Sequence, residues 1–332
     1  MRAWLMNSYE GTEKLQLSEV ADPQPAPGEV LLKVRFAALN PADAFLARAM
    51  YPANPPLPHI LGRDGVGEVI AVGSGVDKVR VGDTVGVLRC DVGVATWGTL
   101  AEKTAVPAAS IAPVPHGWTP EEMAGAPLAF LTAWQALTQW SDPPAPPPAG
   151  SVVLVTGASG GVGIASILLG KSMNLTLIAL SRSAEKGNAL KKLGADFVFD
   201  PADPNVRKAV LTAISPKRVD IAVDNIGGAL FNEVIGMLGY AGRISVVGRS
   251  AGPVPDFNTA SLFFRRNRVG GVAVSDFTPA GAQSAWQEIV RRVDAMGKRP
   301  VVDRVFPFEE VKAAFTRLGQ GPLGKVVVRV AG

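Results

Sequence analysis

The sequence has little cysteine and little histidine, and each shortage excludes a class of chemistry. It contains one cysteine and two histidines among 332 residues. A single cysteine, Cys90, cannot form a disulfide within the chain, which fits a reducing compartment, and we expect it to be a small core or loop residue. Both histidines directly follow a proline. Loop structure therefore accounts for His59 and His116, and no Ser-His-Asp arrangement is expected.

Long apolar runs and clustered charges are also absent. No apolar run reaches membrane-spanning length, and polar residues interrupt the N-terminus before a signal-peptide core could form. The 33 Lys and Arg against 29 Asp and Glu give a net charge of +4, spread along the chain, which argues against a nucleic-acid partner. Hydrophobic residues make up 47% and charged residues 19%, enough apolar material for two buried cores. We therefore expect a globular, soluble, cytoplasmic protein without a membrane partner.

The first third of the chain has the pattern of an antiparallel β domain. Short runs that alternate apolar and polar residues, at 2–6, 29–39 and 66–72, are separated by glycine and proline turns. This predicts an irregular, barrel-like domain. A helix is expected over residues 124–140, followed at 141–150 by a stiff proline-rich connector.

From residue 151 the pattern changes to one of alternating strands and helices. SVVLVT is a continuous apolar strand, followed by a glycine turn and a helix over 162–173. Further strands are expected at 175–180, 197–199, 221–223 and 243–247. The alternation predicts an α/β fold with a parallel sheet wound with helices. A long helix at 279–296 and a last strand at 325–330 follow, and we expect this tail to pack on the first domain.

The segment VLVTGASGGVG at 153–163 places small residues between a strand and a helix start. Gly160 and Gly163 stand three apart, with Ala158 where the first glycine of GxGxxG usually stands. Free N–H groups and the dipole of the helix that begins near Gly161 would attract phosphates. We predict a dinucleotide site here, with a plain structural turn as the alternative. Its expected phosphate-binding residues are Ser159, Gly160, Gly161 and Val162.

The end of the second strand in this half decides between NAD and NADP, because an acidic residue there would bind the ribose diol of NAD. The chain reads ALSRSAEK, with Ser181 and Arg182 at that place and Lys186 one helical turn further. Hydroxyl and cationic donors suit a 2′-phosphate, so we predict NADPH. In the alternative interpretation Arg182 and Lys186 are ordinary solvated charges.

Four segments together resemble the medium-chain dehydrogenase/reductase superfamily over nearly the whole chain. They are APGEVLLKVRFAALNPAD at 26–43, PHILGRDGVGEVIAVGSGVDKVRVGDTV at 58–85, GASGGVG at 157–163 and GKVVV at 324–328. The resemblance implies a GroES-like, mostly antiparallel β domain at 1–124 and 266–332, and a Rossmann domain with a doubly wound parallel sheet at 125–265. In this family the substrate lies in the cleft between the two domains.

Zinc-dependent members of the family carry a cysteine near residues 40–43 and a His-Glu pair after Leu-Gly. This sequence has Asn40 at the first place and Arg63 where the imidazole should stand. A structural zinc would need four cysteines, so the resemblance implies no metal. Without a Lewis acid, reduction of an acceptor is favoured over alcohol oxidation. The motif NPADAFLARAMYP at 40–52 is similar to that of zinc-free, zeta-crystallin-like quinone oxidoreductases and of enoyl-thioester reductases.

The resemblance implies that Asn40 and Tyr51 polarise the carbonyl of the acceptor, with Asp43 orienting Asn40 or the nicotinamide ribose. A tyrosine at the place of Tyr51 acts as a proton donor in enoyl reductases, whereas in quinone reductases it shapes the pocket. From the residues alone, Asn40 could be a turn residue and Asp43 the first-turn carboxylate of a short helix.

The resemblance also assigns residues to the cofactor and to an arginine near the acceptor. Arg266 is the candidate arginine, with Arg265 or Arg268 as alternatives. The positions assigned to the cofactor are Thr132, Val247, Gly248 and Lys325. Asn225 is added because it follows the fourth strand, at the carboxyl edge of the sheet where ligands bind.

The function expected from these observations is NADPH-dependent hydride transfer to a quinone or another α,β-unsaturated carbonyl. An enoyl-CoA or enoyl-thioester reductase is the alternative enzyme, because several arginines could bind a phosphopantetheine arm. These are Arg48, Arg63, Arg265, Arg266 and Arg268. A non-catalytic NADPH-binding protein, crystallin-like or RNA-binding, is the alternative from another class. By analogy with relatives that pair through a Rossmann edge strand, we expect a homodimer that uses residues 262–274.

Overall fold

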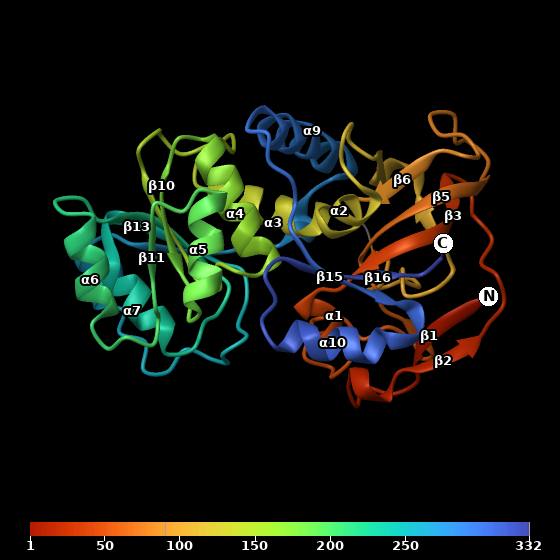
Figure 1. The fold of residues 1–332 in the computed structure, drawn as a ribbon, viewed down its shortest axis with the longest axis horizontal. Helices are drawn as coiled ribbons and strands as arrows, with labels where there is room; N and C mark the ends of the chain where they lie inside the picture. The colour runs from red at the N-terminus through yellow and green to blue at the C-terminus, as the bar shows by residue number, and fades with distance from the viewer. Residues whose placement is uncertain (90, 332) are drawn as a thin grey trace. The chain divides into compact units, whose positions relative to one another are not determined.

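The computed structural model describes residues 1–89 and 91–331, so Cys90 lies outside the described residues. The chain divides into two compact units (Figure 1). Unit 1 comprises Met1–Leu128, Ser275–Gln287 and Arg299–Gly332, and unit 2 comprises Ala129–Val274 and Glu288–Lys298. Within the described residues, no helix is both long and apolar enough to cross a membrane.

Unit 1 is built on a seven-stranded sheet in the order β15-β16-β3-β5-β6-β8, with β7 paired to β3. All pairs except β15–β16 are antiparallel. The strands are β3 (Glu29–Ala38), β5 (Asp64–Val72), β6 (Thr84–Val87), β7 (Lys103–Pro107), β8 (Ile111–Pro113), β15 (Val302–Pro307) and β16 (Lys325–Arg329). A second sheet joins β2 (Gln16–Glu19), β1 (Arg2–Met6) and β4 (His59–Ile60). The helices of unit 1 include α1 (Pro41–Leu46), α2 (Pro120–Gly125) and α10 (Val311–Gly319).

The C-terminal strand β16 completes the sheet that the N-terminal strands begin. Figure 1 shows this blue strand beside the red and orange strands of the same unit. Val327 stands opposite Ala38 of β3, and Val326, Val327 and Val328 are fully buried. An apolar strand buried on both faces stabilises the unit only when it pairs on both edges, which β15 and β3 provide. The expectation that the tail packs on the first domain is confirmed.

Unit 2 contains a parallel six-stranded sheet in the order β11-β10-β9-β12-β13-β14. Its strands are β9 (Val152–Val155), β10 (Thr176–Leu180), β11 (Phe197–Phe199), β12 (Val219–Asp224), β13 (Leu238–Val246) and β14 (Arg268–Gly271). The connecting helices are α4 (Gly161–Ser172), α5 (Ala184–Leu193), α6 (Val206–Ala213), α7 (Leu230–Met237) and α8 (Ala260–Phe264). Counted along the chain this is the Rossmann order, which reverses between β9 and β12. Ligands bind at such a reversal, at the carboxyl ends of the strands.

Two boundaries differ from the sequence prediction. The helix expected over 124–140 is two helices, α2 and α3 (Pro127–Thr138), because Pro127 lacks the N–H that a continuous helix would need there. The segment after residue 266 does not all belong with the tail, since β14 pairs with β13 in the parallel sheet. The backbone of β14 pairs with β13 in this sheet. Its sequence RVGG has no apolar pattern from which a strand could be predicted.

Candidate active site and cofactor site

The glycine turn of unit 2 joins the buried strand β9 to α4. Gly157 has a φ of 56°, in the left-handed region that favours glycine. Gly160 is the N-cap of α4, and no side chain of the described residues caps this helix end. The first N–H groups of α4, at Gly161 and Val162, therefore lack partners within the helix and face any anion bound beside Ser159. This uncapped start fits a dinucleotide pyrophosphate.

Gly163 allows α4 to approach the turn closely. A Cβ on Gly163 would lie 2.5 Å from the carbonyl oxygen of Gly157 and 2.6 Å from Ala158. Both neighbours are backbone atoms, so a side chain would push the helix away from the turn. A Cβ on Gly160 would meet only the Gly157 oxygen, at 3.4 Å, which leaves the ligand side of the turn open.

Two residues that sequence analysis missed, Thr156 and Asp224, join the ends of β9 and β12 where the strand order reverses. Thr156 Oγ1 donates to Asp224 Oδ1 at 2.7 Å, and both residues are fully buried. Asp224 also accepts from the N–H of Gly227 at 3.1 Å. Asn225 Nδ2 donates to the Thr156 carbonyl at 2.8 Å. The sequence did carry a sign of these two residues, because Thr156 directly follows the buried strand β9 and Asp224 is the last residue of the buried strand β12.

The positions expected to contact nicotinamide in unit 2 gather at the same edge. The N–H groups of Val247 and Gly248 donate to the Asp224 carbonyl at 2.8 and 3.2 Å. A Cβ on Gly248 would lie 2.8 Å from the Asn225 carbonyl oxygen. Asn225, Val247 and Gly248 therefore lie together at the carboxyl ends of β12 and β13, where this kind of sheet binds ligands.

The residues expected to bind the 2′-phosphate lie between β10 and α5. Ser183 is the N-cap of α5, and its Oγ accepts from the N–H of Lys186 at 3.3 Å. Arg182 is exposed, and it forms no ion pair with any described residue. Ser181, Arg182 and Lys186 thus share one strand end and one helix start.

Thr132 and the three arginines have different environments. Thr132 is half-buried in α3. The guanidinium of Arg265 donates to two main-chain carbonyls at the end of α7, at 3.1 and 3.3 Å. Arg266, with a φ of 54°, and Arg268 are exposed. The contacts of Arg265 are therefore structural, which leaves Arg266 and Arg268 as candidates.

A buried polar trio of Asn40, Asp64 and Lys325 lies in unit 1. Lys325 Nζ donates to Asn40 Oδ1 at 2.6 Å and to Asp64 Oδ2 at 3.1 Å. Asn40 Nδ2 donates to the same Asp64 oxygen at 3.0 Å. The three residues are 8%, 0% and 6% exposed. They come from the end of β3 and the starts of β5 and β16, which are neighbours in the sheet.

Asp43, in α1, lies beside this trio. Its Oδ2 accepts from the N–H of Asn40 at 2.8 Å, so it caps the first turn of the helix, as the structural alternative described. Its Oδ1 has no hydrogen-bond partner among the described residues, and the side chain is 0% exposed. Burial raises the pKa of Asp43 to about 6, against the opposing effects of the Asn40 bond and the charges of Arg63 and Lys325.

Tyr51 is paired with Arg63, which the sequence offered only as a possible cation for a phosphopantetheine arm. Arg63 Nη1 donates to the Tyr51 hydroxyl at 3.0 Å. The guanidinium carbon also lies 5.4 Å from the centroid of the Tyr51 ring, within the range of a cation–π contact. Tyr51 and Trp97 are half-buried and pack against the same hydrophobic core.

Comparison with known proteins identifies the family. A family model for the alcohol dehydrogenase GroES-like domain matches residues 26–116, and one for zinc-binding dehydrogenases matches residues 161–295. The human synaptic vesicle membrane protein VAT-1 homolog is 30% identical over 355 residues, which cover 99% of this chain and 86% of that protein. The chain belongs to the medium-chain dehydrogenase/reductase superfamily. A quinone oxidoreductase from Sus scrofa is 27% identical to this dehydrogenase/reductase, over 99% of this chain and 97% of that one.

Solved structures agree with this assignment. An NAD-dependent alcohol dehydrogenase is 32% identical, with a TM-score of 0.91 and full coverage (100%) of both chains. A mycobacterial protein solved with NADPH is 26% identical, with a TM-score of 0.89 and coverage of 99% and 100%. This dehydrogenase/reductase is an oxidoreductase from a family that binds nicotinamide cofactors, and it is similar to quinone oxidoreductases along its full length.

The two positions at which zinc-dependent relatives carry Cys and His ligands hold Asn40 and Arg63 in this dehydrogenase/reductase. Both side chains bind protein partners, Asn40 in the trio and Arg63 at Tyr51. Across residues 1–89 and 91–331, no group of three or more His, Cys, Asp or Glu side chains is placed to hold a metal ion. His59 is a single buried imidazole whose pKa burial lowers.

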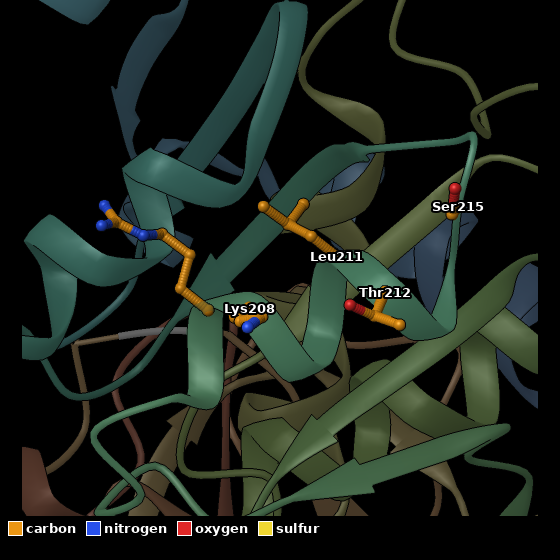
Figure 2. Close-up of a pocket in the computed structure, with 5 residues that line it drawn as sticks. Lys208, Leu211, Thr212 and Ser215 are labelled. Carbon is orange, nitrogen blue, oxygen red and sulfur yellow. The ribbon is translucent and has the colours of Figure 1, made fainter.

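Unit 2 also has a surface hollow of about 460 Å³ along α6. Figure 2 shows Lys208, Leu211 and Thr212 on the helix and Ser215 just beyond its end. Since α6 leads into the amino end of β12, this helix end lies at the sheet edge opposite the glycine turn. The hollow is therefore not part of the cofactor site.

The raised pKa of Asp43 predicts a pH-dependent stability. Between its ordinary value of 3.8 and about 6, Asp43 is protonated in the folded chain and ionised in the unfolded chain, so stability should fall as pH rises through this window. A shift of this size corresponds to at most about 3 kcal/mol. Asp43→Asn keeps an oxygen for the Asn40 N–H and should flatten the profile. Urea unfolding across pH 4–7 measures it, and equal slopes in both proteins would contradict the prediction.

Proposed function

We propose that this dehydrogenase/reductase is a metal-independent, NADPH-dependent enzyme that transfers hydride to a quinone or another α,β-unsaturated carbonyl. The observation that carries the proposal is the contact between Arg63 and Tyr51. At the place of the family's imidazole ligand stands a cation that donates to a tyrosine hydroxyl, an arrangement suited to polarising a carbonyl by hydrogen bonding. The full-length similarity to quinone oxidoreductase supports this class of acceptor.

The choice of NADPH is supported by the charge at the end of β10. Arg182 is an exposed cation, and Ser181 and Lys186 add a hydroxyl and an ammonium group within one helical turn. A 2′-phosphate has oxygens that accept from each of these groups. A structural relative was solved with NADPH, whereas another carries an NAD-dependent name. The local chemistry supports the phosphorylated cofactor.

Each unit of the chain has its own part in the proposed reaction. NADPH, when bound, supplies the hydride from C4 of its nicotinamide ring. In unit 2, the uncapped start of α4 holds the pyrophosphate. In unit 1, Asp64 fixes Asn40 and Lys325, so that the remaining N–H groups of Lys325 and Asn40 are oriented donors for a carboxamide or carbonyl oxygen. Asp43 keeps Asn40 at the start of α1.

The alternative enzyme, an enoyl-thioester reductase, needs positive charge for a phosphopantetheine arm. The structure leaves Arg48 in a surface ion pair with Glu13 and engages Arg265 with main-chain carbonyls. Fewer arginines are then free for the arm than the sequence offered, which favours the quinone. Family membership favours an enzyme over the non-catalytic alternative.

The function is tested by comparing acceptors. With NADPH, kcat/KM for 1,4-benzoquinone and 9,10-phenanthrenequinone should exceed that for crotonyl-CoA by about tenfold or more, since only the quinones take protons directly from water. EDTA should leave these rates unchanged, and elemental analysis should find no stoichiometric metal. Faster turnover of crotonyl-CoA would favour the enoyl reductase, and loss of activity in EDTA would overturn metal independence.

Cofactor choice is tested with Arg182→Ala. Loss of one charge-assisted hydrogen bond should weaken NADPH binding by about 1.5 to 3 kcal/mol, while NADH binding should hardly change. Lys208→Ala, at an exposed lysine of the α6 hollow, is the matched control and should affect neither cofactor. Fluorescence titration gives both dissociation constants. If NADPH and NADH lost the same binding free energy, Arg182 would have a structural role and would not recognise the 2′-phosphate.

We also propose a homodimer that forms at residues 262–274. β14 ends the order of the described sheet, with β13 as its neighbour, and Phe263 and Phe264 nearby are 65% and 76% exposed. A free strand edge beside exposed aromatics favours association. Sedimentation velocity should show a dimer for the wild type and for Val81→Ser, an exposed site in unit 1, and a monomer for the double variant Phe263→Ser/Phe264→Ser. A monomeric wild type would refute the proposal.

A further inference from the structure

Arg63 is a half-buried cation whose charge no carboxylate neutralises by direct contact. Of the nearby acids, Asp64 is bound to Lys325 at 3.1 Å and Asp43 caps α1. Arg63 forms no ion pair with any described residue, and its Nε lacks a hydrogen-bond partner among them. Withdrawing a guanidinium from water without a counter-charge is unfavourable. The positive charge of Arg63 is therefore available to act on a neighbouring group.

The hydrogen bond between Arg63 and Tyr51 has a fixed direction. A guanidinium carries only donors, so in the 3.0 Å contact the Tyr51 oxygen is the acceptor. The hydroxyl hydrogen of Tyr51 is thus not used in this contact and can be donated elsewhere. A hydroxyl that accepts from a cation becomes a stronger donor through its own hydrogen.

The same guanidinium fixes the position of the Tyr51 ring. Its carbon lies 5.4 Å from the ring centroid, so the cation contacts both the face and the hydroxyl of the side chain. Its charge also lowers the pKa of Asp43 against the effect of burial, which indicates that the charge is felt beyond Tyr51. Trp97, packed on the same core, donates its indole N–H to the Pro58 carbonyl at 3.3 Å, which ties it to the loop that follows Tyr51.

We propose that Arg63 is a positioning residue, which orients Tyr51 and polarises its hydroxyl so that it donates to the acceptor oxygen on which negative charge develops. The inference rests on the proposed function and specifies its acceptor as a carbonyl compound that passes through an anionic oxygen. The hydride brings two electrons to a carbon of the acceptor. The carbonyl π pair moves to oxygen, Tyr51 donates a hydrogen bond to the resulting oxyanion, and water supplies the proton that completes the product.

The test is a double-mutant cycle with Tyr51→Phe, Arg63→Met and the combined variant. Arg80→Met, at an exposed arginine of unit 1, is the matched control. Two quantities are measured for each protein: kcat with 1,4-benzoquinone, and the dissociation constant of 4-nitrophenolate, an oxyanion probe whose absorbance reports binding without turnover. Thermal unfolding checks that each variant is folded. Arg63→Lys, which keeps the charge, is measured as the rescue variant, and Arg63→Gln replaces Arg63→Met if that variant does not fold.

Each single substitution should lower kcat and phenolate affinity by about threefold to tenfold, the range for one net hydrogen bond. Because Arg63 acts through Tyr51, the combined variant should lose no more than the larger single loss, whereas independent sites would multiply. Arg63→Lys should recover part of the affinity, and NADPH binding should not change. Multiplying losses, or an Arg63 effect that persists in full without the Tyr51 hydroxyl, would overturn the proposal.

The two measurements separate this inference from the proposed function. If the wild type does not reduce quinones but phenolate binding shows the coupling, the proposed acceptor is wrong and the role of Arg63 stands. If quinones are reduced and neither quantity shows coupling, the proposed function stands and Arg63 is not a positioning residue. A Tyr51→Phe loss above about a hundredfold in kcat with quinone would make Tyr51 the proton donor itself and would overturn the role of water.

Discussion

The carboxylate of Asp64 holds together parts of unit 1 that are far apart in the sequence. It is 0% exposed and accepts from the side chains of Asn40 and Lys325 and from the N–H of Leu128. A buried carboxylate without such donors would be strongly destabilising. The end of β3, the start of α3 and the returning tail must therefore be in place together, and the candidate site forms only when the sheet is complete.

The same bonds determine what the site can do. Lys325 forms an ion pair with Asp64, and the amide oxygen of Asn40 accepts a hydrogen bond from Lys325. The side chains of the trio thus form hydrogen bonds with one another. Some N–H donors of Asn40 and Lys325 remain for a ligand, whereas the amide oxygen of Asn40 is already used as an acceptor. Arg63 adds a second cation, which the trio does not neutralise. Two cations held at fixed positions and partly shielded from water can stabilise negative charge that appears during a reaction. This is the electrostatic requirement of hydride transfer to a carbonyl.

Most of the fold could be predicted from the sequence, because the buried faces of strands and helices require apolar residues at regular spacings. The runs SVVLVT and KVVV, and the glycines from Gly157 to Gly163, identified β9, β16 and the start of α4. The segment RVGG has no such pattern, although the structure pairs it with β13 as strand β14. At Pro127 the apolar pattern was misleading, because it continues through the break between α2 and α3. The missing N–H of this one proline divides the predicted helix in two.

The candidate site was harder to predict, because motifs identify residues that face ligands and not the residues that hold them. Asn40, Asp43 and Tyr51 came from a family pattern, whereas Asp64 received no role and Arg63 was considered only as a missing metal ligand and as a cation for a phosphopantetheine arm. The missing information was strand register. Ala38 stands opposite both Asp64 and Val327, which brings the residues just beyond these strand ends to one point. A sequence that specifies the strands but not their register therefore fixes which side chains are buried and leaves open which of them meet.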